Sequence, residues 1–390
     1  MTHAALILNA GSSSLKFAVY VDADETPEAS GQVDRIGPGP DHAEITLADA
    51  SGTALPVNAP GSLEDHQQAL NAALSGLRDN FPDIQIGAVG HRVVHGGPDF
   101  TAPTLIDDEV LGRLTELEPL APLHQPHCLS GIRAAQAAFP DAQQVACFDT
   151  SFHRSMPRLN EIYAIPREYY DDGIRRYGFH GISYDYISGA LRQTDPQLSS
   201  GRVVVAHLGN GASLCALRNG KSVATTMGFS ALDGLAMGTR SGQIDPGVLL
   251  YLLDQGMAPA DLSNMLYRKS GLLGLSGLSN DMRTLENSDL PEAAEAVSYF
   301  IQRLQRGIAE MAAAMEGLDG IVFTAGIGEH SASIRAETCR GLAWMGVTLD
   351  DAANQKGAAV ISAPESRIAV RVMATREDLV ILRAVRKLAA

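Results

Sequence analysis

Two stretches of the chain place small polar residues between strand-like runs, a pattern typical of a hairpin whose turn approaches a phosphate group. The first spans Leu6–Tyr20 and the second spans Val203–Leu217. Glycine in such a turn leaves backbone N–H groups uncovered, and serine or asparagine adds further hydrogen-bond donors. Either turn alone could be an ordinary polar hairpin, but two copies about half a chain apart favour a duplicated nucleotide-handling fold. The candidate residues of the first turn are Asn9, Ser12, Ser14 and Lys16.

An arginine and an aspartate follow two further apolar runs and could bind an anion and position it. Arg92 lies in Gly90–Gly97, where a strand ends in a glycine pair, and its guanidinium can donate two parallel hydrogen bonds to a carboxylate or phosphate. Asp149 directly follows the apolar run Val145–Phe148, a position from which a carboxylate can hold Mg²⁺ or orient a nucleophile. A surface ion pair and a turn-starting aspartate are the alternatives.

Three glycine-rich segments in the second half carry the remaining candidates. His180 lies between an aromatic residue and a glycine in Arg175–Gly181, although most isolated histidines are structural. Arg240 lies in a loop just before a predicted helix, where its charge could stabilise a transferring phosphoryl group. The segment Phe323–Ser331 enters a Gly-x-Gly turn that could admit adenine or phosphate, which is weak as a signal on its own.

Length, charge and cysteine content narrow the class of protein. A chain of 390 residues with 45% hydrophobic content exceeds what one core usually supports, so we expect two domains. The net charge of −15 argues against a nucleic-acid or anionic-membrane surface, so anion sites must be local clusters of cations. Four cysteines without a CxxC pair, no signal-peptide pattern and no long apolar run predict a cytoplasmic protein without a membrane span.

Strand-like and helix-like segments alternate along the chain, which predicts α/β layers. A helix over Gly247–Leu253 is well marked, because Asp245 can cap it and Pro246 occupies its first turn. The stretches Gly37–Pro40 and Asp49–Gly61 are predicted to form a surface excursion. The predicted strands are Val89–Val94, Gln144–Phe148, Val203–Leu208, Gly320–Phe323 and Ile368–Met373, and a second long amphipathic helix is predicted over Ala293–Ala314.

Taken together and in order, these motifs closely resemble the acetate kinase family over nearly the whole chain. The matching segments also include the terminal Thr375-Arg-Glu377. The resemblance implies two duplicated ribonuclease-H-like, actin-like ATPase domains around a nucleotide cleft, in the superfamily of acetate and sugar kinases, Hsp70 and actin. The expected domains are residues 1–149 with 379–390, and residues 150–378. The resemblance also implies that the protein binds Mg²⁺, with Mn²⁺ as an alternative, and that ATP and ADP are its substrates. It further implies a homodimer.

The resemblance further implies roles for individual residues. Asn9 and Glu377 would lie near Mg²⁺, and Arg92 would bind the acyl substrate. Asp149 would orient that substrate or handle a proton, while His180 and Arg240 would stabilise the transition state. The acyl pocket would use Val94, Leu123, Phe179 and Ala231, and His124 would support the phosphoryl path together with His207. The residues expected near ATP are Ser12, Ser14, Lys16, His207, Leu208, Gly209, Asn210, Gly211, Asp281, Met282, Arg283, Gly326, Ile327, Gly328, Glu329 and His330.

The implied reaction is direct in-line transfer of the ATP γ-phosphoryl group to acetate, giving acetyl phosphate and ADP. Because a carboxylate is already a nucleophile, neutralising the charge repulsion matters more than a strong base. The chain departs from the usual family pattern at Ile182 and Tyr184 beside His180, at His330, and at Ala231, which trims one wall of the pocket.

Two other functions stay open. The smaller Ala231 allows a propionate or butyrate kinase, since one methylene shifts discrimination by only about 1–3 kcal/mol. A nucleotide-binding module of the Hsp70 and actin type, without kinase activity, is the remote alternative. The converging cations Arg92, His180 and Arg240 argue against it, because such a module needs no site for a second anionic substrate.

Overall fold

The computed structural model describes residues 2–11, 14–36, 43–58, 61–122 and 124–389. The chain divides into two compact units, and each is described by itself. The first comprises Met1–Ser151 with Arg376–Ala390, and the second comprises Phe152–Thr375. These limits differ by a few residues from those expected. The difference matters for Glu377, which the sequence placed with the second domain but whose helix packs on the sheet of the first unit.

The first unit is built on one mixed sheet. Its described strands run in the order β4-β3-β2-β1-β5-β7-β6, where β1, β2 and β3 are antiparallel neighbours and β5 and β7 are parallel to β1. The strands are β1 (Thr2–Ala10), β2 (Ser14–Val21), β3 (Ala29–Asp34), β4 (Glu44–Asp49), β5 (Ile84–Val93), β6 (Thr104–Leu105) and β7 (Gln143–Phe148).

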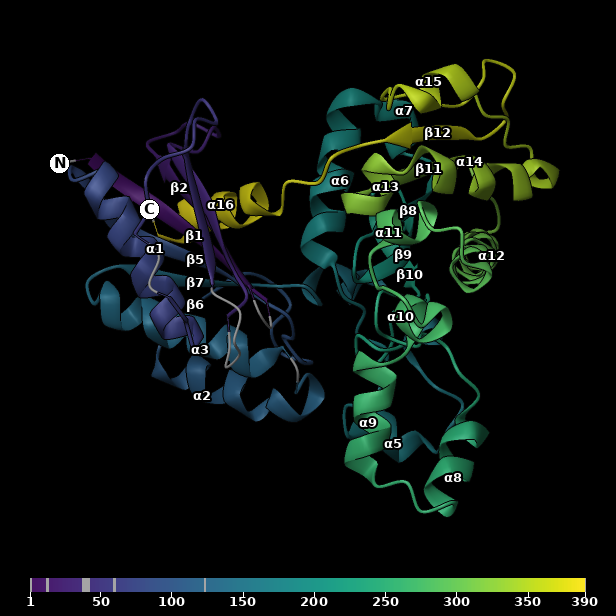
Figure 1. The fold of residues 1–390 in the computed structure, drawn as a ribbon, viewed down its shortest axis with the longest axis horizontal. Helices are drawn as coiled ribbons and strands as arrows, with labels where there is room; N and C mark the ends of the chain where they lie inside the picture. The colour runs from purple at the N-terminus through teal and green to yellow at the C-terminus, as the bar shows by residue number, and fades with distance from the viewer. Residues whose placement is uncertain (1, 12–13, 37–42, 59–60, 123, 390) are drawn as a thin grey trace. The chain divides into compact units, whose positions relative to one another are not determined.

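Helices cover both faces of this sheet because successive side chains of a strand point to opposite faces. Leu6 and Leu8 of β1 pack in a core with residues of α1 and α3. On the other face, the Cα of Gly90 in β5 lies so close to α16 that an added Cβ would stand 2.5 Å from Ile381. Figure 1 shows α16 in yellow beside the purple and blue strands of this unit. The helices are α1 (His66–Asn80), α2 (Asp108–Glu116), α3 (Gln125–Ala138) and α16 (Glu377–Leu388).

The second unit repeats this strand order. Its described strands run β10-β9-β8-β11-β12, again an antiparallel meander of three strands followed by two strands parallel to the first. They are β8 (Arg202–Leu208), β9 (Ala212–Arg218), β10 (Lys221–Thr225), β11 (Gly320–Thr324) and β12 (Ala369–Val372). The order matches β3-β2-β1-β5-β7, so the duplicated α/β fold predicted from the two hairpins is confirmed.

The helices of the second unit also lie on both faces of its sheet. Tyr184, Ile187 and Leu191 of α6 pack against Val203 and Val205 of β8, while α12 contacts β8 and β9 from the other side. The helices are α4 (Arg158–Glu161), α5 (Arg167–Asp171), α6 (Gly181–Thr194), α7 (Pro196–Ser199), α8 (Pro246–Asp254), α9 (Pro259–Arg268), α10 (Gly271–Ser276), α11 (Met282–Glu286), α12 (Pro291–Ala314), α13 (Ala325–His330), α14 (Ala332–Gly341) and α15 (Asp351–Gln355).

The local sequence signals behave as predicted. Asp245 caps α8 by accepting a hydrogen bond from the Gly247 N–H at 2.8 Å, and Pro246 is the first residue of that helix. All four cysteines are buried free thiols. In the described chain, no helix is long and apolar enough to cross a membrane. The predicted excursion at Gly37–Pro40 lies outside the described residues, whereas the described residues 50–58 contain no helix and only an isolated bridge at Ala54.

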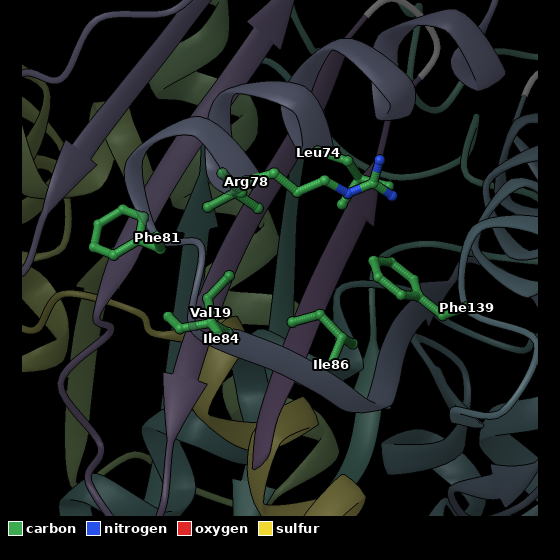
Figure 2. Close-up of a pocket in the computed structure, with 8 residues that line it drawn as sticks. Val19, Leu74, Arg78, Phe81, Ile84, Ile86 and Phe139 are labelled. Atoms are coloured by element: carbon green, nitrogen blue, oxygen red, sulfur yellow. The ribbon is translucent and has the colours of Figure 1, made fainter. Parts of the chain in front are cut away.

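A small apolar cavity of about 70 Å³ remains beneath α1. Figure 2 shows Val19, Ile84 and Ile86 of the sheet facing Leu74 and Arg78 of the helix. None of the candidate site residues lines it, so this cavity is a packing gap of the core.

Candidate active site

The candidate site residues of the first unit gather where three parallel strands end. β1 pairs in parallel with β5, and β5 pairs in parallel with β7, so their carboxyl ends meet at one edge of the sheet. Asn9 lies at the end of β1, Arg92 near the end of β5, and Asp149 directly after β7. Carboxyl ends of parallel strands are where open α/β sheets bind ligands.

Arg92 and Asp149 form a bidentate ion pair. The arginine donates from Nε to Oδ1 at 2.9 Å and from Nη2 to Oδ2 at 2.6 Å. The Asp149 side chain is only 1% exposed and that of Arg92 is 18% exposed. Burial by itself lowers the pKa of Arg92, but the negative charges of Asp149 and Glu377 raise it, with a net rise above its ordinary value. The guanidinium is therefore a fixed, permanent cation.

The pair leaves Arg92 with donors to spare. A guanidinium has five N–H groups, and Asp149 takes two of them. A third is donated from Nη1 to Asn9 Oδ1 at 3.1 Å. Among the described residues, one N–H on Nη1 and one on Nη2 have no acceptor, and two is the number of N–H groups that a carboxylate accepts in a bidentate pair.

Glu377 reaches the same edge of the sheet from the first turn of α16. Its Oε2 accepts a hydrogen bond from Asn9 Nδ2 at 3.2 Å and lies 4.0 Å from Arg92 Nε. The start of the helix is held by Asp378, which accepts hydrogen bonds from Tyr20 and from Arg376. Asn9, Arg92, Asp149 and Glu377 thus form one connected polar cluster, which we call the Arg92 cluster.

The Arg92 cluster fits a magnesium ion that takes few ligands from the protein. Within the described chain, no group of three or more His, Cys, Asp or Glu side chains is arranged to hold a metal ion. Mg²⁺ commonly binds through one or two carboxylates, several waters and the phosphates of its substrate. The Glu377 carboxylate and the Asn9 amide oxygen are groups of that kind, and the amide oxygen also accepts a hydrogen bond from Arg92 Nη1 at 3.1 Å.

The other described candidate residues of the first unit lie outside the Arg92 cluster. Lys16 stands opposite Asn9 in the β1–β2 pairing and is exposed, while Ser14 is half-buried and closes the turn through its carbonyl, which accepts from the Gly11 N–H. Val94 is buried after β5, and His124 precedes α3. Ser12 and Leu123 lie outside the described residues.

His180 anchors the candidate site of the second unit. It precedes α6 in the left-handed backbone region, with φ of 58°. Such a conformation costs a non-glycine residue about 1–3 kcal/mol and is typical of functional sites. Its Nδ1 lies 2.8 Å from Ser213 Oγ, and its ring stacks on that of His207 with centroids 4.2 Å apart. His207 Nδ1 in turn lies 2.9 Å from Ser183 Oγ.

Arg240 lies against the second hairpin turn. A Cβ added to Gly211 would stand 2.6 Å from Arg240 Nη2 and 3.3 Å from His180 Nε2, so the two side chains flank this glycine. Arg240 Nη1 donates to the Ala231 carbonyl at 2.6 Å. Its loop must pass close to the turn, because a Cβ on Gly238 would stand 2.0 Å from Asn210 Oδ1. Because Gly238 has no side chain, the loop can approach the turn after β8 closely and place the Arg240 guanidinium beside it.

A cavity of about 470 Å³ opens beside the same hairpin turn. This volume lies within the range of small-ligand pockets, about 300–1,000 Å³. The cavity joins the turn after β8 to the starts of α11 and α13. Its lining residues are Gly209, Asn210, Asn280, Asp281, Met282, Arg283, Glu286, Gly326, Ile327, His330 and Ser331.

Several residues expected near ATP hold the turns instead of lining this cavity. Leu208 is buried, and the Gly328 carbonyl accepts a hydrogen bond from the buried Arg335. Glu329 Oε1 accepts from the Ala325 N–H at 2.8 Å and the Thr375 N–H at 3.4 Å. Ala325 itself has φ of 64°, so Glu329 stabilises a strained backbone at the head of α13.

Sequence reasoning did not single out Ser213, Ser183, Asn280, Glu286 or Ser331. The signal for Ser213 was available in the hairpin, because the residue opposite His207 in a tight β8–β9 pairing faces the same side. The departure at Tyr184 also has a structural consequence, since its hydroxyl lies 2.5 Å from Ser213 Oγ. Tyr184 therefore joins the hydrogen bonds around His180.

Comparisons with known proteins agree over nearly the whole length of the chain. Residues 4–383 match the model of the acetokinase family. The chain is 48% identical to an acetate kinase of Methylocella silvestris, covering 98% of this chain and 97% of the relative. It is 51% identical to an acetate kinase of Nitrobacter hamburgensis, covering 96% of this chain and 94% of the relative.

Solved structures show the same fold. A propionate kinase from Francisella tularensis superimposes with a TM-score of 0.91 at 36% identity, covering 98% of each chain. An acetate kinase from Porphyromonas gingivalis superimposes with a TM-score of 0.88 at 35% identity, covering 100% of each chain.

Proposed function

The chain belongs to the acetokinase family, and on that basis we propose that it catalyses the reversible transfer of the ATP γ-phosphoryl group to acetate. One oxygen of the acetate carboxylate attacks the γ-phosphorus, and the bond from that phosphorus to the β–γ bridging oxygen breaks. The products are acetyl phosphate and ADP.

The observation that carries this proposal is that Arg92 is held in one orientation by Asp149 and keeps N–H donors for a further ligand. Its two remaining N–H donors suit a small carboxylate, and the buried Asp149 carboxylate holds the guanidinium in one orientation. Fixed donors of this kind contribute to catalysis by alignment, since little ordering remains to be done when substrate binds. Asp149 is a positioning residue in this proposal and acts through Arg92. The family resemblance assigns contacts with the acyl group to Val94, Phe179 and Ala231, of which Val94 and Phe179 are buried within their own units.

The second unit would hold the nucleotide. The cavity lined by Asp281, Met282 and His330 would take the adenosine part of ATP. Asn210 and Gly211 would offer backbone N–H groups to the phosphates, while the Gly209 N–H closes the turn by donating to the Gly211 carbonyl at 3.0 Å. Asp281 caps α11 by accepting from the Arg283 N–H at 2.7 Å, so it also fixes one wall of the cavity. His330 borders the same space and bears on nucleotide preference.

His180 and Arg240 would stabilise the transition state. Phosphoryl transfer spreads negative charge over the three equatorial oxygens, and donors aimed at them lower the barrier. Both side chains flank Gly211, so both could donate hydrogen bonds to a phosphoryl group bound beside this glycine. His207 would support His180 through the stacked pair, and His124, Ser14 and Lys16 would contribute from the first unit.

Asn9 and Glu377 would hold Mg²⁺, with Mn²⁺ as an alternative. When bound, the ion would neutralise charge on the phosphates of ATP. Glu377 is already fixed by Asn9 at 3.2 Å, so the carboxylate needs little rearrangement to serve as a ligand.

Propionate is a second candidate acceptor. The structurally similar Francisella tularensis protein is a propionate kinase. Ala231 stands where the resembling family often has proline, and it is half-buried with its carbonyl held by Arg240. A smaller wall here would admit one further methylene at a difference of about 1–3 kcal/mol.

A cytoplasmic location is also part of the proposal, and the free thiols support it.

We further propose that the protein is a homodimer. Helix α8 is almost wholly apolar, yet none of its residues is buried. Leu250 is 63% exposed and Tyr251 is 62% exposed. A second copy of this chain covering α8 would remove that apolar surface from water. A monomer by light scattering for the wild type, or an unchanged dimer for Leu250→Glu/Tyr251→Glu, would exclude this interface.

The deciding experiment measures acyl hydroxamate formed from acetate, propionate and butyrate with Mg-ATP and hydroxylamine. Acetate activity with the highest kcat/KM supports the proposed reaction, and a preference for propionate makes the sister activity the correct one. Absence of hydroxamate in a protein that still binds ATP would overturn the kinase proposal.

A further inference from the structure

Ser213 links the side chains of His180 and Tyr184 through two hydrogen bonds. Ser213 Oγ lies 2.8 Å from His180 Nδ1 and 2.5 Å from Tyr184 Oη. Within the described part of the protein, Ser213 Oγ and Tyr184 Oη make no further hydrogen bonds. Both residues are fully buried, so neither hydroxyl can turn to bulk water.

Counting protons selects one arrangement of this chain. The tyrosine hydroxyl has one proton and the serine hydroxyl has one. If Tyr184 donates to Ser213 and Ser213 donates to His180 Nδ1, both hydroxyl protons have an acceptor. If instead His180 donated from Nδ1 to Ser213, either the tyrosine or the serine proton would be left without an acceptor. A buried donor without an acceptor is costly, so the first arrangement is favoured.

We propose that Tyr184, acting through Ser213, holds His180 as a neutral imidazole with its proton on Nε2. The inference rests on the proposed kinase function for its kinetic test only. Tyr184 is a positioning residue, because it acts on His180 and faces no substrate itself. The Nε2–H is the donor on the side of Gly211, where His180 and Arg240 flank the turn.

The groups that face His180 support the neutral form. His207 stacks on the imidazole from β8, and Arg240 lies across Gly211 from it, so two neighbours are cations or can become cations. His153 Nε2 lies 3.0 Å from the carbonyl of Phe179, the residue before His180. Burial lowers the pKa of His153 to about 4, so this neighbour is neutral. Burial also keeps the pKa of Tyr184 well above its ordinary value, so the phenol keeps its proton.

In this arrangement Arg240 and His180 contribute differently to binding the phosphoryl group. Arg240 supplies a full positive charge to the phosphoryl oxygens, and His180 supplies one hydrogen bond of fixed direction without a second charge. A neutral donor does not repel the neighbouring guanidinium, so both can face the same phosphate path.

The test compares Tyr184→Phe and Ser213→Ala with Tyr186→Phe. Tyr186 lies on the same helix, is half-buried, and forms no hydrogen bond through its hydroxyl among the described residues, so Tyr186→Phe is the matched control. Full-length protein carrying ¹⁵N-labelled histidine is titrated by NMR, and His180→Gln identifies the His180 signals. We expect the wild type to show an unprotonated Nδ1 at neutral pH. In Tyr184→Phe and Ser213→Ala the titration should move to higher pH by about 0.5–1 unit, the size expected for losing one hydrogen bond.

Kinetics give a second readout. We expect kcat at pH 7 to fall by about five- to tenfold in Tyr184→Phe, with the acid limb of the kcat profile at higher pH and both KM values within about twofold. The double variant Tyr184→Phe/Ser213→Ala should be no worse than Ser213→Ala, because the two act in series. A wild-type Nδ1–H tautomer, or identical titrations in wild type and Tyr184→Phe, would overturn the proposal. Since the NMR titration needs no turnover, it tests Tyr184 even if the protein phosphorylates another acceptor.

Discussion

The ion pair between Arg92 and Asp149 allows its structural and functional roles to be separated by experiment. Removing Arg92 alone leaves a carboxylate that is 1% exposed without its bidentate partner. Breaking a buried ion pair in this way costs about 3–5 kcal/mol, whereas replacing both members with apolar residues is close to neutral. We therefore expect Arg92→Met to be strongly destabilised and Arg92→Met/Asp149→Leu to recover most of the loss.

The change in melting temperature follows from the same energies. For a unit of this size, 1 kcal/mol shifts the melting temperature by about 2–4 °C, so Arg92→Met should melt about 6–20 °C below the wild type. Arg113→Met is the control within the same unit, since Arg113 pairs with Asp99 at 2.8 Å but both side chains are exposed. Losing that surface pair should cost at most about 1 kcal/mol. Scanning calorimetry of the four proteins gives these differences.

Activity should not follow stability in this series. The double variant regains the fold but lacks the guanidinium that receives the acyl carboxylate. Loss of a buried charged partner costs about 2–5 kcal/mol of binding, or about 30- to 5,000-fold in kcat/KM for acetate. The KM for ATP should stay within about threefold. A double variant with near-wild-type kcat/KM for acetate would refute the reasoning, because Arg92 would then serve only to neutralise Asp149.

Three further changes test other parts of the site. Arg240→Ala should lower kcat by about 100-fold or more with little change in melting temperature, since its guanidinium faces the phosphate path; near-normal turnover in the folded variant would remove Arg240 from the mechanism. Glu377→Gln should raise the Mg²⁺ concentration for half-maximal rate by about tenfold, measured by metal titration of turnover, and an unchanged requirement would place the metal elsewhere. Ala231→Pro should lower the propionate-to-acetate ratio of kcat/KM by about five- to tenfold, and an unaltered ratio from paired assays would mean that Ala231 does not border the acyl group.

Local signals made much of the fold predictable. Each of the two hairpins combines strand runs with turn residues, and a repeated hairpin in one chain implies repeated topology. The helix start at Asp245 needed only a capping side chain and a proline. The structure brings Asn9, Arg92 and Asp149 together at the ends of parallel neighbouring strands, whereas from the sequence each of them was a separate candidate at or after a strand-like run.

Contacts that depend on long-range packing could not be read in this way. Glu377 reaches Asn9 only because α16 returns to the first sheet, and no local pattern at residue 377 reports that return. The contribution of Ser213 depends on the burial of Tyr184 behind it, which strand periodicity alone does not reveal. The cavity wall at Asn280 and Glu286 required the tertiary placement of α11.

The return of α16 bears on how the protein is made. The chain enters the solvent from its N-terminus during synthesis, and domains usually fold in that order. Here the strands of the first unit are translated before the second unit, but the helix that packs against Gly90 and carries Glu377 is translated after it. The second unit, Phe152–Thr375, is complete before that helix leaves the ribosome. The part of the N-terminal sheet that packs on α16 therefore gains this contact only after the whole second unit has been translated, and the Arg92 cluster is completed at the same stage.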